Sequence, residues 1–243
     1  EVKIAKEVQK RLLPTNMMLN DHLQIHAFSK AADDVGGDYY DIYTYPDGKK
    51  IALTIGDVSG NGTTAAFNMA QMKGIFQSLI QLNLPANQFM AYANKAVGAC
   101  LEKKSFITLS LFLIDIENNK FEYARAGHCQ SLHYSEKNKS FSLLEQKGLG
   151  LGIVRNDSYI NHIEQKVYSY EKNDLLILYT DGIIEAANNT GEEYGFEKLY
   201  KVISENITLT PKQLSEVVLN DLYHYTGKKE VNDDYTIIIL KFV

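Results

Sequence analysis

A chain of 243 residues, of which 45% are hydrophobic and 23% charged, is long enough for one large or two small folded domains. Its net charge is −5, from 25 basic and 30 acidic residues, and the absence of a basic run argues against nucleic-acid binding. The apolar runs, such as Asp174–Thr180 and Tyr235–Leu240, are far shorter than the roughly 20 residues that span a bilayer. We therefore expect a cytoplasmic protein with no membrane segment in this chain.

The first predicted element is a helix over Glu1–Leu13, which Pro14 ends. Its apolar residues recur at helical spacing: Ile4, Ala5, Val8 and Leu12. This stripe is typical of a helix that docks on its own domain, and equally of the end of a signalling helix that forms a homodimer. The chain starts at Glu1 rather than Met, and we expect an upstream sensor domain before it.

The remaining elements follow from alternating and helical apolar patterns. In chain order they are strands at Gln24–Ser29, Tyr39–Tyr45 and Lys50–Ile55, helices at Thr63–Leu82 and Ala86–Glu102, strands at Phe106–Ile116, Lys120–Ala126, Gln130–Tyr134, Phe141–Leu144, His162–Val167 and Asp174–Thr180, helices at Phe196–Ser204 and Pro211–Tyr225, and a strand at Tyr235–Val243. Since Lys73 is the only charge in Thr63–Leu82, we expect that helix to be largely buried. The order is not a regular βαβ alternation, so it predicts an α+β fold with helices outside packed sheets.

Acidic motifs of one design recur at the ends of predicted strands, each with aspartate beside glycine or another turn residue. They are Gly36–Asp38, Gly56–Gly62, Thr180–Gly182 and Asn232–Thr236. One Asp-Gly pair is commonly only a turn, but repetition at apolar strand boundaries favours a shared site. Neighbouring aspartates repel one another unless cations neutralise them, and Mg²⁺ and Mn²⁺ prefer oxygen ligands. The pattern therefore predicts a site for divalent cations.

Two further features leave their roles open. His128 follows a predicted strand and could be an acid, a metal ligand or a structural hydrogen-bonding histidine. The glycine-rich Gly148–Gly152 lacks both the Walker lysine and the GxGxxG spacing, so it does not predict a nucleotide site.

Taken in order, the motifs resemble the PPM (protein phosphatase 2C) superfamily, in its bacterial RsbU/SpoIIE-like branch. The resemblance covers nearly the whole chain and is carried by Val8–Pro14 (VQKRLLP), Val35–Asp41 (VGGDYYD), Gly56–Gly62 (GDVSGNG), Ala126–His128 (AGH), Tyr179–Ala186 (YTDGIIEA), Tyr194–Leu199 (YGFEKL) and Asn232–Thr236 (NDDYT). The chain departs from this branch at Cys129 and Gly150, where proline is usual.

The resemblance implies a β-sandwich of two antiparallel sheets flanked by helices. It divides the chain into a signalling or linker helix, residues 1–14, and a phosphatase domain, residues 15–243. It also implies a centre for two divalent cations, Mn²⁺ or Mg²⁺. The implied catalytic residues are all aspartates: Asp38, Asp57, Asp181 and Asp233.

Among the implied metal ligands, Asp57 bridges both ions and the Val58 carbonyl binds one of them. Asp181 and Asp233 complete the shell of the second ion. Asp38 acts nearby, directly or through water, and Asp234 adjoins the ligand set.

The implied reaction is hydrolysis of phosphoserine or phosphothreonine by attack of a metal-bound water. The resemblance points to a STAS-type anti-sigma-factor antagonist as substrate. Two other functions remain open: a catalytically silent module that keeps the fold for binding or regulation, and a metal-dependent hydrolase of small phosphoesters.

Overall fold

The computed structural model describes residues 2–14, 21–227 and 233–243. Asn232 of the last predicted motif therefore lies outside the described residues. The chain divides into two compact units, each made of segments that are distant in sequence. Unit 1 comprises Glu1–Thr15, Asp34–His128 and Glu145–Tyr170, and unit 2 comprises Asn16–Asp33, Cys129–Leu144 and Glu171–Val243.

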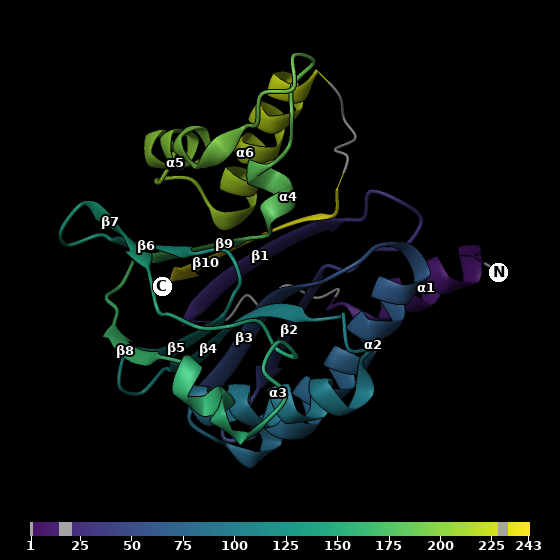
Figure 1. The fold of residues 1–243 in the computed structure, drawn as a ribbon. Coiled ribbons are helices and arrows are strands. Elements are labelled where there is room, and N and C mark those ends of the chain that lie inside the picture. The colour runs from purple at the N-terminus through teal and green to yellow at the C-terminus, as the bar shows by residue number, and fades with distance from the viewer. Residues whose placement is uncertain (1, 15–20, 228–232) are drawn as a thin grey trace. The chain divides into compact units, whose positions relative to one another are not determined.

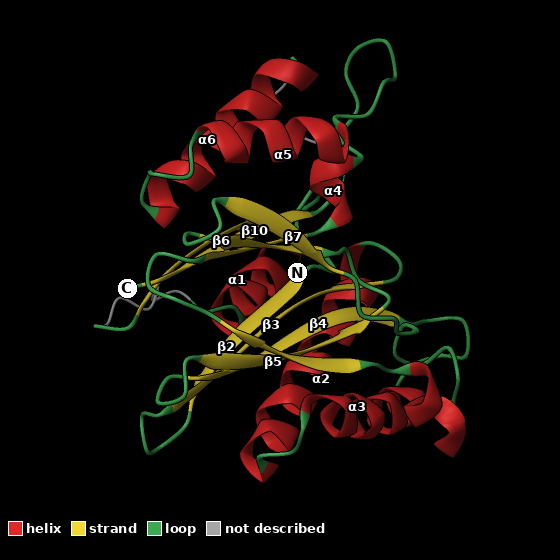
Figure 2. Cartoon of the chain, turned by 90° about the vertical axis from the view of Figure 1, so that its left-hand side faces the viewer, coloured by secondary structure: helices red, strands yellow, loops and turns green. Residues whose placement is uncertain are grey.

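Unit 1 contains a five-stranded antiparallel sheet in the order β2-β3-β4-β5-β8. Its elements are α1 (Val2–Leu12), β2 (Tyr39–Thr44), β3 (Lys50–Val58), α2 (Gly62–Leu79), the 3₁₀ turn η1 (Ile80–Leu82), α3 (Ala86–Cys100), β4 (Ile107–Asp115), β5 (Lys120–Ala126), η2 (Asp157–His162) and β8 (Gln165–Ser169). Figure 2 shows α2 and α3 lying across one face of this sheet. Met69, Met72, Phe76 and Phe89 are fully buried there, so these helices are held by apolar packing.

Unit 2 contains a second five-stranded antiparallel sheet, in the order β1-β10-β9-β6-β7. Its elements are β1 (Leu23–Lys30), β6 (Ser131–Ser135), β7 (Ser140–Leu144), β9 (Leu175–Tyr179), α4 (Asp181–Ile184), α5 (Gly195–Glu205), α6 (Pro211–Thr226) and β10 (Tyr235–Phe242). Helix α6 packs on β1 and β10, and α5 packs on α6 (Figure 1). The apolar strands β9 and β10 are almost wholly buried, as their composition requires.

The α+β prediction, with two antiparallel sheets flanked by helices, is confirmed. Three local predictions were wrong. His162 ends the 3₁₀ turn η2, and the strand begins only at Gln165. The four-residue helix α4 was missed because one turn is too short to show a period.

The third error concerns α2, which is buried along one side only. Its buried residues follow helical spacing, whereas Phe67 is 69% exposed. Uncharged polar residues such as Gln71 face solvent, so the scarcity of charge misled the prediction. None of the described helices is long and apolar enough to cross a membrane.

Helix α1 packs against α2 within unit 1, and this divides the predicted apolar stripe. Leu12 contacts the core of the unit, while Ile4 and Val8 are 68% and 51% exposed. Leu12, near the C-terminal end of the helix, is thus used for docking, while Ile4 and Val8, toward its N-terminal end, are available for contact with another chain.

Candidate functional site

In unit 1, the predicted ligands meet at one end of the sheet. Strand β3 carries Asp57 and Val58 at its last two positions, and β2 starts one residue after Asp38. Tyr39 pairs with Gly56, so the register continued by one residue sets Asp38 opposite Asp57. The structure thus brings together three residues that the sequence analysis had assigned to one cation site.

Glycine at position 37 permits this approach. A Cβ atom at Gly37 would lie 2.7 Å from the Val58 carbonyl oxygen and 3.3 Å from Oδ1 of Asp57. A side chain there would therefore fill the space beside both oxygens. Asp38 is 5% exposed and Val58 1%, so both residues are buried.

The loop after β3 is fastened to the start of β4. The Ser59 backbone N–H donates to the Phe106 carbonyl at 3.0 Å, and the Phe106 N–H donates to Ser59 Oγ at 2.9 Å. This reciprocal pair holds the chain directly after Val58, so the direction of its carbonyl is constrained.

In unit 2, the other predicted ligands lie where β9 ends and β10 begins. These strands pair, and the Thr180 N–H donates to the Thr236 carbonyl at 3.0 Å. In return, the Thr236 N–H donates to Thr180 Oγ1 at 2.8 Å. Asp181 follows the first threonine directly, so these bonds position its backbone.

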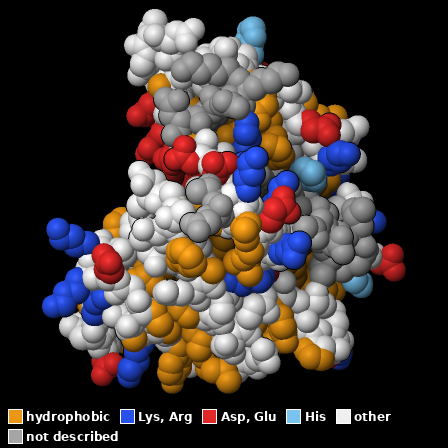
Figure 3. Space-filling model, turned by 90° about the vertical axis from the view of Figure 1, so that its right-hand side faces the viewer, with side chains coloured by type: hydrophobic (Ala, Val, Ile, Leu, Met, Phe, Trp, Pro, Cys, Tyr) orange, Lys and Arg blue, Asp and Glu red, His pale blue; other side chains and the backbone are white. Residues whose placement is uncertain are grey.

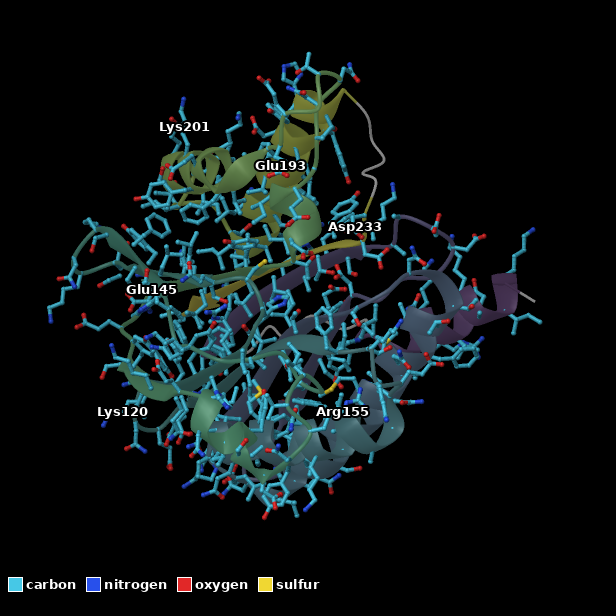
Figure 4. All side chains as sticks on the ribbon, viewed as in Figure 1. Lys120, Glu145, Arg155, Glu193, Lys201 and Asp233 are labelled. Atoms are coloured by element: carbon cyan, nitrogen blue, oxygen red, sulfur yellow. The ribbon has the colours of Figure 1, made fainter. Side chains whose placement is uncertain are left out.

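Gly182 brings the start of α4 against the chain before β10. A Cβ atom at Gly182 would lie 2.0 Å from the Asp234 carbonyl oxygen, closer than any side chain allows. Asp233 lies two residues before the start of β10 (Figure 4). Asp181 and the Asp233–Asp234 pair are therefore neighbours within unit 2.

The two acidic residues before β10 also accept backbone hydrogen bonds. Oδ1 of Asp234 accepts from the Ala32 N–H at 2.8 Å, which ties the end of β1 to this point. Oδ1 of Asp233 accepts from the N–H of Asp234 at 2.8 Å. One oxygen of each carboxylate thus accepts a backbone hydrogen bond. The second oxygen of each carboxylate determines how that side chain can coordinate a cation.

Two acidic neighbours were missed by the sequence analysis, Glu185 and Glu193. Partial burial and the nearby charges of Asp181, Glu193 and Asp233 raise the pKa of the Glu185 carboxyl. Glu185 stands four residues after Asp181, a spacing that would have revealed it had α4 been predicted. Figure 3 shows several acidic side chains gathered on one part of the face that it draws.

His128 is buried, and its contacts favour a structural role. Its Nδ1 lies 2.9 Å from Thr108 Oγ1, and its carbonyl accepts a hydrogen bond from the Arg125 guanidinium at 2.5 Å. These bonds connect β4 with the end of β5.

The loop that carries Gly150 is ordered by backbone pairing. Ile107 and Leu151 exchange two backbone hydrogen bonds, of 2.9 and 2.8 Å. A Cβ atom at Gly150 would lie 3.1 Å from Ile153 Cδ1. The loop is therefore held by this backbone pairing, although glycine stands at position 150 where proline is usual.

A hollow of about 560 Å³ in unit 1 lies between α3 and η2, away from these aspartates. It is lined by residues that include Tyr92, Lys95 and Arg155. The Arg155 guanidinium, labelled in Figure 4, donates to the carbonyls of Gly98 and Leu101 at 3.1 and 3.0 Å. The hollow contains none of the predicted metal ligands, and its arginine caps the end of α3.

The donor chemistry of both groups suits a hard cation, because it consists of carboxylate and carbonyl oxygens. The Val58 carbonyl oxygen and Asp57 Oδ1 both lie close to Gly37, and this proximity fits an ion-binding role for the two residues. Among the described residues, no three His, Cys, Asp or Glu side chains are arranged as a closed metal site.

Comparison with known proteins identifies the family of the chain. The family described as Stage II sporulation protein E (SpoIIE) matches residues 47–243. Phosphoserine phosphatase RsbU of Bacillus subtilis (strain 168) is 31% identical over 244 residues, which cover 99% of this chain and 70% of RsbU. Phosphoserine phosphatase RsbP of the same organism is 24% identical, over 99% of this chain and 57% of RsbP.

Solved structures share the fold. The SiaA-PP2C domain of Pseudomonas aeruginosa matches with a TM-score of 0.84 at 18% identity, and the match covers 100% of this chain and 96% of the SiaA chain. RsbX in complex with magnesium has a TM-score of 0.68 at 18% identity, covering 94% and 99%. The catalytic domain of the serine threonine protein phosphatase PstP, in complex with two manganese ions, has a TM-score of 0.59 at 13% identity, covering 91% and 99%.

The chain therefore has the PP2C-type fold. Since the family match covers most of the sequence and the similarity to RsbU extends over nearly all of this chain, the chain belongs to the SpoIIE family.

Proposed function

We propose that this chain hydrolyses phosphoserine or phosphothreonine in a partner protein, with the help of two divalent cations, Mn²⁺ or Mg²⁺. Its class, a protein phosphatase of bacterial signalling, rests on the SpoIIE family and on its similarity to RsbU and RsbP. The observation that carries the cation requirement is the approach of Gly37 to the Val58 carbonyl and the Asp57 carboxylate, beside the buried Asp38.

We assign the ligands as the sequence analysis predicts. Asp57 would hold both cations, and the Val58 carbonyl would hold one of them. Asp181 and Asp233 would hold the second, with Asp38 acting directly or through water. Asp234 contributes beside them, and its Oδ1 already holds the Ala32 N–H.

When bound, the two cations would offset phosphoryl charge and lower the pKa of water. The contribution of the chain is to hold carboxylates that otherwise repel one another. In unit 1, the packing of Gly37 and the Ser59–Phe106 hydrogen bonds fix Asp57 and Val58. In unit 2, the Thr180–Thr236 hydrogen bonds and the close packing of Gly182 fix Asp181. Each group is thus prepared before a cation arrives.

The test is hydrolysis of a phosphoserine peptide with added Mn²⁺, with added Mg²⁺ and with EDTA. We expect turnover with metal and none with chelator. Full activity in EDTA, with no metal detected in the protein, would refute the cation requirement. A parallel assay with p-nitrophenyl phosphate distinguishes the alternative of a small-phosphoester hydrolase, which would turn over that substrate in preference to the peptide. Absence of turnover on both, with metal bound, would favour a catalytically silent module.

We further propose a STAS-type anti-sigma-factor antagonist as the phosphoprotein substrate, in the cytoplasm. The motifs quoted above and the 31% identity to RsbU support this assignment. Residues 1–14 would form a signalling or linker helix that follows a sensor domain, and residues 15–243 the phosphatase domain. Phosphoproteomics of a deletion strain tests the substrate, since the antagonist should accumulate in its phosphorylated form.

We also propose that α1 forms a homodimer through its exposed residues Ile4 and Val8. A helix with two apolar side chains exposed at i and i+4 can pair with a second copy through that side. Sedimentation of the purified chain tests this directly.

A further inference from the structure

Helix α1 is tied by specific hydrogen bonds to the loop that leads into β2. The Gln9 side chain engages both backbone polar groups of Gly36: Nε2 donates to the Gly36 carbonyl at 2.6 Å, and Oε1 accepts from the Gly36 N–H at 3.1 Å. The Tyr40 hydroxyl donates to the Pro14 carbonyl at 3.0 Å. An exposed ion pair, Lys6 to Asp34 at 3.3 Å, joins the same segments and contributes little.

Of these contacts, the one made by the Gln9 amide is to the segment Gly36–Asp38, which ends at a predicted cation ligand. Gly36 is followed by Gly37, whose approach to Asp57 and Val58 defines the unit 1 ligand group. Asp38 comes next. The contact at Gly36 is therefore two residues before the predicted ligand Asp38. It is one residue before Gly37, whose backbone packs against the predicted ligands Asp57 and Val58.

The two hydrogen bonds between Gln9 and Gly36, here called the Gln9 clamp, matter because Gly36 and Gly37 are consecutive glycines. Glycine adopts more backbone conformations than any other residue, so Gly36–Gly37 has little conformational preference of its own. A side-chain amide that satisfies both the N–H and the C=O of Gly36 fixes the orientation of that residue. Both glycines are buried, so no solvent could replace these bonds without an opening of the loop.

We infer that Gln9 is a positioning residue for cation binding: by clamping Gly36, it holds Gly37 and Asp38 where Asp57 and Val58 can share a cation with them. This inference rests on the proposed metal-dependent phosphatase. Loss of residues that orient metal ligands typically weakens metal affinity about 10–100-fold. Because Gln9 acts through the backbone, we expect the lower end of that range, about tenfold.

The experiment compares wild type, Gln9→Met and Lys10→Ala. Methionine keeps the length and helix propensity of glutamine but forms neither hydrogen bond. Lys10 is exposed on the same helix and serves as the matched control. Calorimetric titration with Mn²⁺ gives the affinity, and amide hydrogen exchange of Gly36–Asp38 in EDTA reports on the loop without metal.

For Gln9→Met we expect about tenfold weaker Mn²⁺ binding and faster exchange at Gly36, with neither change in Lys10→Ala. Phosphopeptide turnover by Gln9→Met should recover toward the wild-type kcat when Mn²⁺ is raised about tenfold. A structural role alone would lower the thermal midpoint in EDTA and leave the Mn²⁺ affinity unchanged.

The outcomes separate the two proposals. Equal Mn²⁺ affinity in wild type and Gln9→Met overturns the role of Gln9 and leaves the proposed function standing. Failure of the wild type to bind either Mn²⁺ or Mg²⁺ in the same titration overturns the proposed function and this inference with it. Should Gln9→Met not fold, Gln9→Ala is tested in the same way, and loss of folding in both assigns Gln9 to stability and overturns the inference.

Discussion

Gly182 offers the sharpest test of the unit 2 geometry. In Gly182→Ala, the new Cβ would lie 2.0 Å from the Asp234 carbonyl oxygen and 2.9 Å from its carbonyl carbon. An ordinary contact begins near 3.4 Å, so the two segments must separate by about 1.4 Å. Both obstructing atoms belong to the backbone, so no side-chain rotation can relieve the clash.

The expected cost follows from this geometry. Overpacking in a well-packed interior costs about 1–3 kcal/mol, and a backbone obstruction places Gly182→Ala near 3 kcal/mol. For a chain of this size, about 2–4 °C of thermal midpoint corresponds to each kcal/mol. We therefore expect a midpoint roughly 6–12 °C below that of the wild type.

The assay is thermal unfolding followed by circular dichroism in EDTA, where bound metal cannot contribute. Gly74→Ala is the matched control, because Gly74 lies in α2 and a Cβ atom added there would have nothing within 4 Å. That variant should gain up to about 1 kcal/mol from helix propensity. A Gly182→Ala midpoint within about 1 °C of the wild type would refute the close approach of α4 to Asp234.

Three further outcomes are expected. Asp57→Asn and Asp181→Asn should each abolish phosphopeptide turnover while the midpoint in EDTA holds or rises, since a repelling charge is removed; near-wild-type rates would exclude that residue as a ligand. Burial alone would raise the pKa of Asp174, but hydrogen bonds from His133 and from two backbone N–H groups outweigh it and lower the pKa. A folded-state pKa below the unfolded value of about 3.9 adds to the free energy of unfolding above that pH, and this contribution is lost as pH falls through the folded-state pKa. Urea unfolding between about pH 5 and 3 should therefore show a smaller loss of unfolding free energy for Asp174→Asn than for wild type. Val8→Glu should leave the fold intact and abolish any dimer in sedimentation; an unchanged dimer would place the interface elsewhere.

Local pattern was sufficient for most elements. The β4–β5 hairpin was predictable because its strands alternate and a short polar turn joins them, with Asn119 at a φ of 51°. Helix α6 begins at Pro211 with a capping box from Thr210 and Gln213, and its predicted start was correct. Short elements escaped, since α4 and η2 contain too few residues for a period to appear.

The candidate site was predictable in its residue types but not in its surroundings. The aspartates stood out because each follows or precedes an apolar strand beside glycine or another turn residue. Glu185 did not stand out, because its proximity to Asp181 depends on α4. Gln9 was one polar residue on an amphipathic helix until the structure showed its amide bound to Gly36.

By itself, the sequence determined most of the strands and helices and which oxygen-rich motifs end them, because periodicity and turn chemistry act over a few residues. Only the tertiary structure decided which motifs are neighbours. Asp181 and Asp233 are far apart in the chain, and pairing of β9 with β10 brings them together within unit 2. Pairing of β2 with β3 does the same for Asp38 and Asp57 in unit 1. Strand partners and their register depend on long-range hydrogen bonding and burial of apolar faces, which no local window contains.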